Sequence, residues 1–235
     1  MIAQTTPTPR MRPTVTVSRA TEADMPALAE GQLLAFGERL YGLIEPLSIR
    51  ADTAIRYRRA AARLLALIDR PEVLVVKATV PAPGDAPTCS SVNAGMAFWH
   101  RPGAPVTNTQ KRDIARMADE TDEERDAWEG VDWKAWNGML DKFDEVRQRI
   151  MGDEPHWYLG PLWTHPDYQG QGIGSALLRH AIALADATEP PTAMYLEASP
   201  AGQPVYARHG WERVEGTETV MIRRGAGTAA GGAES

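Results

Sequence analysis

The chain has 235 residues, of which 43% are hydrophobic, enough for one core with a large insertion. The formal net charge of −6 argues against nucleic acid as a partner, because phosphate binding requires a surplus of Lys and Arg. The one cysteine, Cys89, excludes an internal disulfide and a four-cysteine zinc site.

The ends of the chain differ in composition from the rest. Residues 1–13 are rich in Thr, Pro and Arg, and residues 225–235 are mostly Gly, Ala and Thr, so we expect both to be disordered tails. Residues 14–224 are expected to form a single domain. Its first strand is predicted at residues 14–18, where valines alternate with hydroxyl residues. A helix should follow, with Thr21 as its N-cap.

Residues 51–69 have helical periodicity, and the helix should end before Pro71. We expect Ile55, Leu64, Leu65 and Ile68 to be buried and the arginines of this segment to lie on the outer face. Two β-rich runs come next, at residues 73–80 and 93–100. The three prolines of residues 81–87 predict a loop between them, so the pair should form a hairpin.

Residues 101–153 are longer than the usual connection and predict a helical insertion. Within it, residues 133–150 form one apolar helical face. Its members are Trp133, Trp136, Leu140, Phe143, Val146 and Ile150. We interpret Trp128, Trp133 and Trp136 as core or lid packing, the alternative being an aromatic wall that faces a substrate. The acidic run at residues 119–126 is interpreted as a solvated face or loop, the alternative being a rim that attracts amines.

The most informative segment is residues 156–188, which predicts a strand, a glycine-rich turn and a helix in that order. The turn reads Gln169-Gly170-Gln171-Gly172-Ile173-Gly174. Glycines allow the backbone to approach a ligand closely, and the first helical turn has N–H groups without partners. Those N–H groups and the helix dipole favour an anion, so the turn is interpreted as a pyrophosphate cradle.

Two common phosphate-binding motifs do not fit this turn. A Walker loop requires Lys followed by Ser or Thr, whereas Gly174 is followed by Ser175 and Ala176. A dinucleotide fingerprint requires G-x-G-x-x-G, and here the third glycine comes one position early.

The pattern that remains is Q-x-x-G-x-G, formed by Gln169, Gly172 and Gly174. At this point the sequence resembles the GCN5-related N-acetyltransferase (GNAT) superfamily. The resemblance rests on HPDYQGQGIGSALL at residues 165–178, YLEAS at residues 195–199 and VYARHGW at residues 205–211. It implies an α/β (α+β) fold with a mixed, mostly antiparallel sheet of six to seven strands, splayed at the acetyl-CoA site and flanked by helices.

The resemblance also implies how acetyl-CoA is bound. In that family the turn holds the CoA pyrophosphate, and the preceding strand pairs its backbone with the pantetheine arm. The matching residues are Leu162, Trp163, Thr164, Gln169, Gly170, Gln171, Gly172, Ile173, Gly174 and Ser175. Pro161 fits a splay because it has no N–H, although a simple edge or bulge proline explains it nearly as well.

Two residues are candidate catalytic groups by the same resemblance. Tyr206 matches the family's tyrosine acid, and with an ordinary pKa near 10 it can donate to a thiolate of similar basicity. The alternative is a structural tyrosine at a helix end. Glu197, on the strand after the glycine helix, is the candidate base, with a buried structural glutamate as the alternative. His156 is the second choice, and an ordered-water path requires no dedicated base.

The sequence departs from the family at three places. Gln169 and Gln171 stand where basic residues often occur, which reduces charge support for the phosphates. Ser199 stands near a position often filled by an Asn that contacts pantetheine. The long insertion is expected to cover the acceptor side, so acceptor specificity cannot be taken from shorter relatives.

The sequence also limits which metals and membranes we expect the protein to bind. The five histidines lack ligand spacing, so we expect no catalytic metal. The first thirty residues lack a secretory signal, and no stretch approaches the roughly 18 apolar residues of a membrane span, which predicts a cytoplasmic protein without a membrane partner.

Three functional hypotheses follow. The first is an N-acetyltransferase that transfers an acetyl group from acetyl-CoA to a primary amine, either a small molecule or a peptide or protein N-terminus, by direct attack. The second is a non-catalytic acyl-CoA-binding or regulatory module on the same fold. The third is a homodimeric assembly protein that uses the Trp-rich insertion as its interface.

Overall fold

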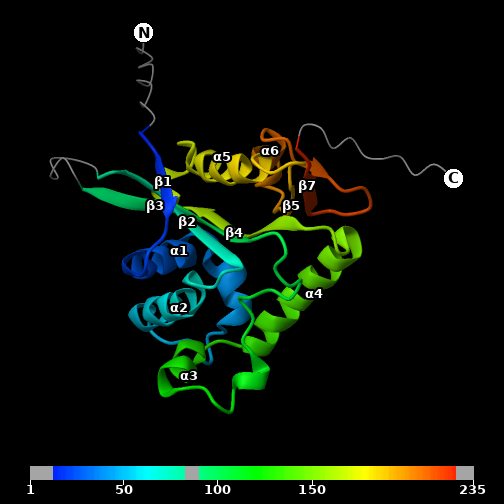
Figure 1. Ribbon diagram of the computed structural model, residues 1–235. Coiled ribbons are helices and arrows are strands. Elements are labelled where there is room, and N and C mark those ends of the chain that lie inside the picture. Colours follow the sequence, from blue (N-terminus) through cyan, green and yellow to red (C-terminus); the bar gives the residue numbers. More distant parts are fainter. Residues whose placement is uncertain (1–12, 83–89, 226–235) are drawn as a thin grey trace, which may run out of the picture.

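A single sheet of seven strands, in the order β1-β2-β3-β4-β5-β7-β6, organises the described residues 13–82 and 90–225 of the computed structural model (Figure 1). The strands are β1 (Thr16–Arg19), β2 (Val73–Pro81), β3 (Ser91–His100), β4 (His156–Thr164), β5 (Ala193–Glu197), β6 (Glu212–Arg213) and β7 (Val220–Arg223). Neighbouring strands are antiparallel except for the parallel pair β4–β5. The mixed, mostly antiparallel sheet expected from the sequence is therefore confirmed.

The predicted hairpin forms the centre of this sheet. β2 and β3 pair along their length, from Val73 opposite His100 to Pro81 opposite Ser91. Side chains of a strand alternate between the two faces, and both faces of β2 are buried. Most of the predicted loop at residues 81–87, together with Cys89 and both predicted tails apart from Pro13 and Gly225, lies outside the described residues.

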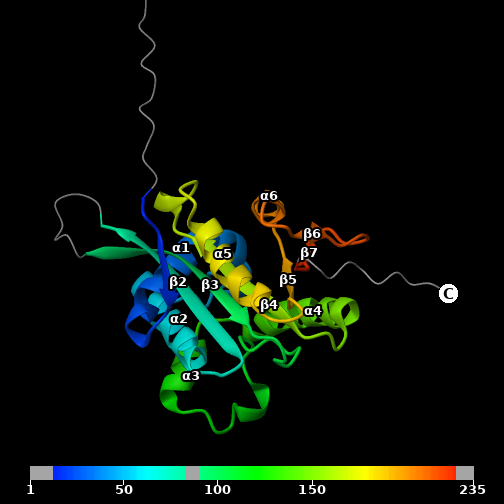
Figure 2. The same cartoon turned by 45° about the horizontal axis from the view of Figure 1, so that its top comes forward.

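Helices cover both faces of the sheet (Figures 1 and 2). α5 (Ile173–Asp186) and α6 (Gln203–Ala207) lie on one face, which we call the α5 face. α1 (Met25–Ile44), α2 (Thr53–Ile68) and α4 (Trp133–Met151) lie on the other, called the α4 face, with the short α3 (Asp122–Trp128) packed beyond α2. Each face has its own hydrophobic clusters, so α4 and α5 are separated by the full thickness of the sheet.

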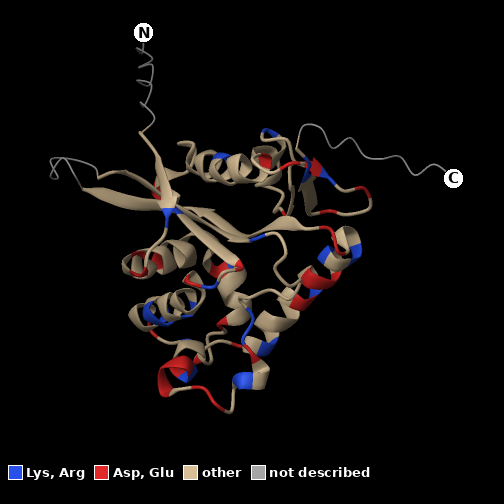
Figure 3. Cartoon of the chain, viewed as in Figure 1, with Lys and Arg blue, Asp and Glu red and all other residues tan. Residues whose placement is uncertain are grey.

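Three of the four arginines of α2, Arg56, Arg59 and Arg63, lie inward, contrary to the sequence-based expectation, whereas Arg58 is exposed as expected. Arg59 is only 9% exposed, and its Nη2 lies 2.8 Å from an Asp126 oxygen on α3. Figure 3 shows the basic residues of α2 next to the acidic α3. Among the predicted core residues, Leu64 and Ile68 are buried, but Ile55 and Leu65 are 37% and 43% exposed. The insertion covers the charged side of α2, which periodicity within α2 cannot reveal.

The predicted apolar face of α4 is also wrong in part. Leu140 is buried as expected, but its buried neighbours on the helix are mainly polar: Asn137, Asp144, Arg147 and Met151. Asn137 exchanges two hydrogen bonds with the backbone of Arg112, and Asp144 accepts one from the Asn108 N–H. The buried face of α4 therefore holds the preceding loop in place through polar contacts.

Smaller differences concern element ends. β1 begins at Thr16 rather than Thr14, because its pairing with β2 starts there. Thr21 caps a 3-10 helix at Glu22–Asp24 that leads into α1. Leu184 on α5 is 40% exposed although its side chain is apolar. Within residues 13–82 and 90–225, no helix combines the length and apolarity needed to cross a membrane.

Candidate functional site

The parallel pair β4–β5 separates halfway along β4. Their pairing runs from His156 opposite Ala193 to Leu159 opposite Leu196 and then stops. β4 nevertheless continues to Thr164 and remains paired with β3 on its other side. Residues 160–164 therefore have one backbone edge without a strand partner. We call the place where β4 and β5 separate the junction. The unpaired edge lies beside it, and α5 and α6 flank it on the α5 face (Figure 2).

A bulge marks the point of separation. Ala97 pairs with Leu162 and Trp99 with Leu159, so β4 has one residue more than β3 across this step, at Gly160 and Pro161. Pro161 has no N–H to contribute to a ladder. Both interpretations of Pro161 are thus compatible with the structure, because the bulge and the loss of pairing with β5 occur together.

The glycine-rich turn follows the unpaired edge directly. Gly170 and Gly172 have φ values of 75° and 89°, a left-handed conformation that favours glycine. The first helical hydrogen bond of α5 runs from the Ala176 N–H to the Gly172 carbonyl, so the N–H groups of residues 173–175 have no helical partner. These N–H groups and the dipole of a 14-residue helix together favour an anion.

One contact ties the turn to the C-terminal part of the domain. The Ser175 hydroxyl lies 3.0 Å from Nε2 of His209, a residue in the turn after α6. Burial and neighbouring arginines lower the pKa of His209, which favours the neutral imidazole. His209 therefore connects the two sides of the junction, a role that sequence reasoning missed. It lies within the quoted VYARHGW motif, but only the fold brings it to Ser175.

Tyr206 lies on α6, on the α5 face. Its ring packs edge-on against Trp211, with centroids 6.0 Å apart. Gly210, with a φ of 85°, lets the chain turn so that the Trp211 N–H reaches the Tyr206 carbonyl. Burial raises the pKa of Tyr206 to about 12. The pKa therefore lies above the expected ordinary value near 10, because the partly buried phenol loses hydration that would stabilise the phenolate.

Glu197 lies at the end of β5, with its carboxylate on the α4 face beside Tyr158, Tyr195 and the guanidinium of Arg147. Burial raises the pKa of Glu197 to about 7, and the two tyrosines and Arg147 offset part of that effect. The guanidinium of Arg147 stacks 3.8 Å from the Tyr158 ring centroid and is almost fully buried. Sequence reasoning missed Arg147, because a lone arginine on an amphipathic helix usually faces solvent.

The two candidate catalytic side chains therefore lie on opposite faces of the sheet. Tyr206 packs against the cluster of the α5 face, whereas Tyr195 and Tyr158, the neighbours of Glu197, belong to a cluster on the α4 face. The part of the sheet where β4 and β5 are no longer paired lies between these two side chains' faces and is a place where the two faces can communicate.

Two other candidates make local contacts. His156 Nδ1 lies 2.6 Å from the Glu154 carbonyl oxygen, and burial lowers its pKa. The Ser199 hydroxyl accepts a hydrogen bond of 3.3 Å from the Gly202 N–H just before α6. The side chain of Trp163 lies on the α4 face in contact with Gly31, so only its backbone is available along the strand edge.

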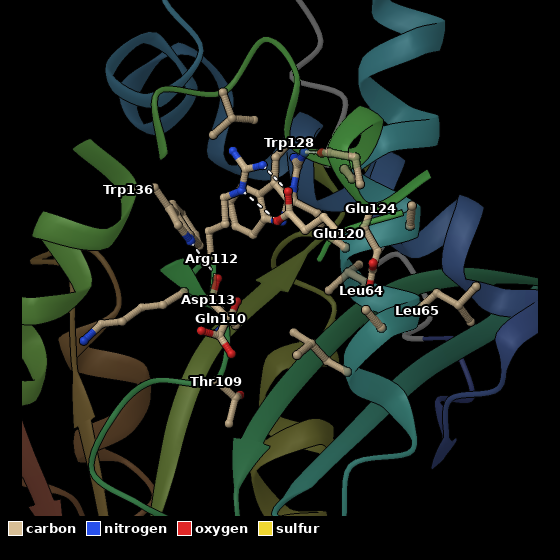
Figure 4. Close-up of a pocket in the computed structure, with 18 of the residues that line it drawn as sticks. Leu64, Leu65, Thr109, Gln110, Arg112, Asp113, Glu120, Glu124, Trp128 and Trp136 are labelled. Carbon is tan, nitrogen blue, oxygen red and sulfur yellow. Dashed lines mark hydrogen bonds and ion pairs between the residues drawn. The ribbon is translucent and has the colours of Figure 1, made fainter. Parts of the chain in front are cut away.

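A pocket of about 380 Å³ lies on the α4 face between α1, α2 and the insertion, and we call it the insertion pocket (Figure 4). Its walls include Gln32, Tyr41, Leu64, Gln110, Trp128 and Trp136. The volume is within the range of small-ligand pockets, about 300–1,000 Å³. Trp133 is not part of the wall. Over residues 13–82 and 90–225, no three His, Cys, Asp or Glu side chains are grouped so that they could hold a metal ion.

Comparison with known proteins agrees with this geometry. Residues 137–211, from within α4 to Trp211, match the model of the acetyltransferase (GNAT) family. The resemblance to the GNAT superfamily is thereby confirmed. No curated protein sequence matches the chain.

Several solved structures are similar to the chain at low sequence identity. A mosquito arylalkylamine N-acetyltransferase-like 5b is 15% identical over 89% of this chain and 98% of that chain, with a TM-score of 0.52. A histone acetyltransferase HPA2 and related acetyltransferase from Corynebacterium glutamicum is 23% identical over 93% and 100%, with a TM-score of 0.49. PaiA N-acetyltransferase from Thermoplasma acidophilum, solved with coenzyme A, is 13% identical over 90% and 99%, with a TM-score of 0.49. The mosquito protein supports the GNAT fold.

Proposed function

We propose that this chain, whose residues 137–211 match the GNAT acetyltransferase family, transfers an acetyl group from acetyl-CoA to a primary amine by direct attack. The acceptor is a small-molecule amine or the N-terminus of a peptide or protein. The observation that carries the proposal is the unpaired edge of β4 leading into a turn with free N–H groups. An extended amide-bearing arm with a pyrophosphate at one end fits that combination.

Acetyl-CoA would use both parts of this edge. Its pyrophosphate would accept hydrogen bonds from the turn at residues 169–175, where the helix dipole adds favourable charge. Its pantetheine amides would pair with the backbone of residues 162–164, as an added strand would. Ser199 remains a predicted contact of the pantetheine arm, although its hydroxyl already accepts a hydrogen bond from the Gly202 N–H.

The acceptor would approach from the α4 face, where Glu197 lies. A carboxylate with a pKa of about 7 is ionised in part at neutral pH and is well matched to removing a proton from an amine. The neutral nitrogen attacks the thioester carbonyl and gives up its proton to Glu197, a C–N bond forms, and the C–S bond breaks. A backbone N–H of the β4 edge would stabilise the oxyanion.

The leaving sulfur would emerge on the α5 face beside Tyr206. With a pKa of about 12, Tyr206 keeps its proton at neutral pH and can donate a hydrogen bond to the sulfur as it becomes negative. Full transfer of that proton to a thiolate with a pKa near 8.5 is uphill. We therefore assign Tyr206 chiefly to stabilising the thiolate, which takes its final proton from water.

The experiment compares Tyr206→Phe with the matched control Tyr57→Phe on α2. Thiol release is followed with acetyl-CoA and a panel of amines and N-terminal peptides, and acetyl-CoA binding is measured by calorimetry. Tyr206→Phe should lower kcat by about tenfold to a hundredfold with unchanged acetyl-CoA affinity, whereas Tyr57→Phe should match the wild type.

Other outcomes separate the hypotheses. Binding of acetyl-CoA without thiol release for any amine would favour the non-catalytic acyl-CoA-binding module. Absence of binding heat from folded wild-type protein would contradict the donor site itself. An unchanged kcat in Tyr206→Phe would remove Tyr206 from the reaction.

A further inference from the structure

We propose that the insertion pocket is the acceptor site and that it selects a weakly basic primary amine carrying an aromatic or bulky apolar group. The inference rests on the proposed acetyl transfer and names its substrate class. It draws on four features of the pocket: its position, its apolar wall, one unpartnered oxygen and the pairing of its charges.

The position of Gln110 connects the pocket with the unpaired edge of β4. Gln110 belongs to the pocket wall, and its Nε2 would lie 3.0 Å from a Cβ added at Gly160. Gly160 is the residue at which β4 loses its pairing with β5. The pocket is also on the same face of the sheet as Glu197. An amine held in the pocket therefore lies close to the β4 edge at Gly160, on the face of the sheet that carries the proposed base.

The wall suits a flat or branched apolar group. Leu64 and Ile44 supply its aliphatic part, and the rings of Trp128 and Trp136 supply its aromatic part. The Trp136 indole is held in place because its Nε1 donates a 2.8 Å hydrogen bond to the Gln110 carbonyl (Figure 4). Arg63 and Arg112 stack on Trp128 at 5.5 and 5.9 Å from its ring. Rings fixed in this way favour a ligand of defined shape.

One buried acceptor in the wall has no partner. Nε2 of Gln32 donates a 3.2 Å hydrogen bond to the Tyr41 hydroxyl, but Oε1 has no partner among the described residues. The Gln32 side chain is 9% exposed. A buried polar atom without a hydrogen bond is unfavourable, so an N–H of the ligand would satisfy it.

The charges of the wall disfavour a strongly basic amine. Five basic and four acidic residues line the pocket. Glu120 pairs with Arg112, and Glu124 lies 3.5 Å from Arg116, while the remaining carboxylates, Asp113 and Glu123, belong to exposed residues. An ammonium group buried in the apolar part of the pocket would lose water, and the half-buried carboxylates of Glu120 and Glu124 are already paired with arginines. An amine that enters neutral avoids that loss and is already the nucleophile.

The test uses three primary amines as probes. Phenylalaninamide has an aromatic group and a weakly basic α-amine, alaninamide lacks the ring, and phenethylamine keeps the ring but is strongly basic. Wild-type kcat/KM for phenylalaninamide should exceed that for alaninamide by about thirtyfold, the effect of burying one aromatic side chain. Phenethylamine should bind more weakly than phenylalaninamide in competition at pH 7.

Two variants report on the pocket itself. Ala66→Trp places a large ring beside the pocket, on an exposed position of α2, and should lower kcat/KM for phenylalaninamide at least tenfold. Ala183→Trp, on the exposed side of α5, is its control. Gln32→Met should raise KM for phenylalaninamide about fivefold through the loss of one hydrogen bond, with Gln148→Met as control.

Calorimetry with acetyl-CoA on every variant separates the two proposals. Acetyl-CoA should bind all of them with wild-type affinity. If acetyl-CoA does not bind, or no amine releases thiol, the proposed function fails. If thiol is released but alaninamide and phenylalaninamide are equivalent, or Ala66→Trp leaves phenylalaninamide turnover unchanged, only the acceptor assignment is overturned.

Discussion

Replacing Glu197 with Gln should change how stability depends on pH. The buried Glu197 carboxyl has a pKa of about 7, against an ordinary value of 4.5. Between these two pH values the folded protein holds a proton that the unfolded chain has lost, so stability falls as pH rises and levels off above about pH 7. Between the two limits the free energy of unfolding falls by about 3 kcal/mol. Glu197→Gln has no such proton, and its advantage over the wild type should grow by about this amount from pH 4.5 to pH 8.

The assay is urea unfolding of the wild type and the variant at half-unit pH steps between those limits. The difference between the two proteins cancels the contribution of all other titrating groups. Glu212→Gln on β6, an exposed site, is the control for a change of charge and should run parallel to the wild type. In turnover, the wild-type kcat/KM should rise through about pH 7, and Glu197→Gln should lose this rise together with about a hundredfold in rate. Parallel stability curves for Glu197→Gln and the wild type would refute the assigned pKa.

Three further predictions follow from the site. Gly172→Ala should lower the free energy of unfolding by about 1–2 kcal/mol and weaken acetyl-CoA binding, because the φ of 89° at Gly172 is left-handed. The control, Gly138→Ala within α4, should raise the free energy of unfolding by about 0.5–1 kcal/mol. Urea unfolding and calorimetry measure both variants, and equal effects would contradict the role of the turn. Arg147→Met should shift the acidic limb of the pH–rate profile to higher pH, because the guanidinium lowers the pKa of Glu197. A limb at unchanged pH would show that it reports the titration of another group. His209→Ala should weaken acetyl-CoA binding about fivefold through a looser turn, and unchanged calorimetric affinity would reduce His209 to a surface residue.

The local elements of the site could be predicted from the sequence. The β2–β3 hairpin, the strand at β4, the glycine turn and α5 all depend on short-range signals: valine-rich runs, φ-permissive glycines and helical periodicity. These signals operate over a few residues, so a single sequence contains them. The separation of β4 from β5 was reached only through the family resemblance, because Pro161 alone fits a bulge equally well.

The insertion shows where such signals end. The existence of α4 was predicted correctly, but its buried face was not, since Asn137, Asp144 and Arg147 are buried by contacts to a loop that precedes the helix. The same holds for Arg59 on α2, which is buried only because α3 supplies Asp126. Sequence periodicity predicts that a polar side chain is exposed unless its partner is known. Each of these partners is distant in sequence or lies in an irregular segment.

Those same polar contacts explain why the insertion can shape a site. Asp144 and Asn137 of α4 hold the loop at residues 108–112 through its backbone, and Trp136 fixes the Gln110 carbonyl. Gln110 is thereby held against Gly160, where the strand pairing ends. An apolar helix face would pack against the loop without fixing its register, whereas directional hydrogen bonds set it to within one residue. The polar face of α4, which sequence periodicity misassigns, is therefore what places the insertion pocket beside the proposed thioester edge.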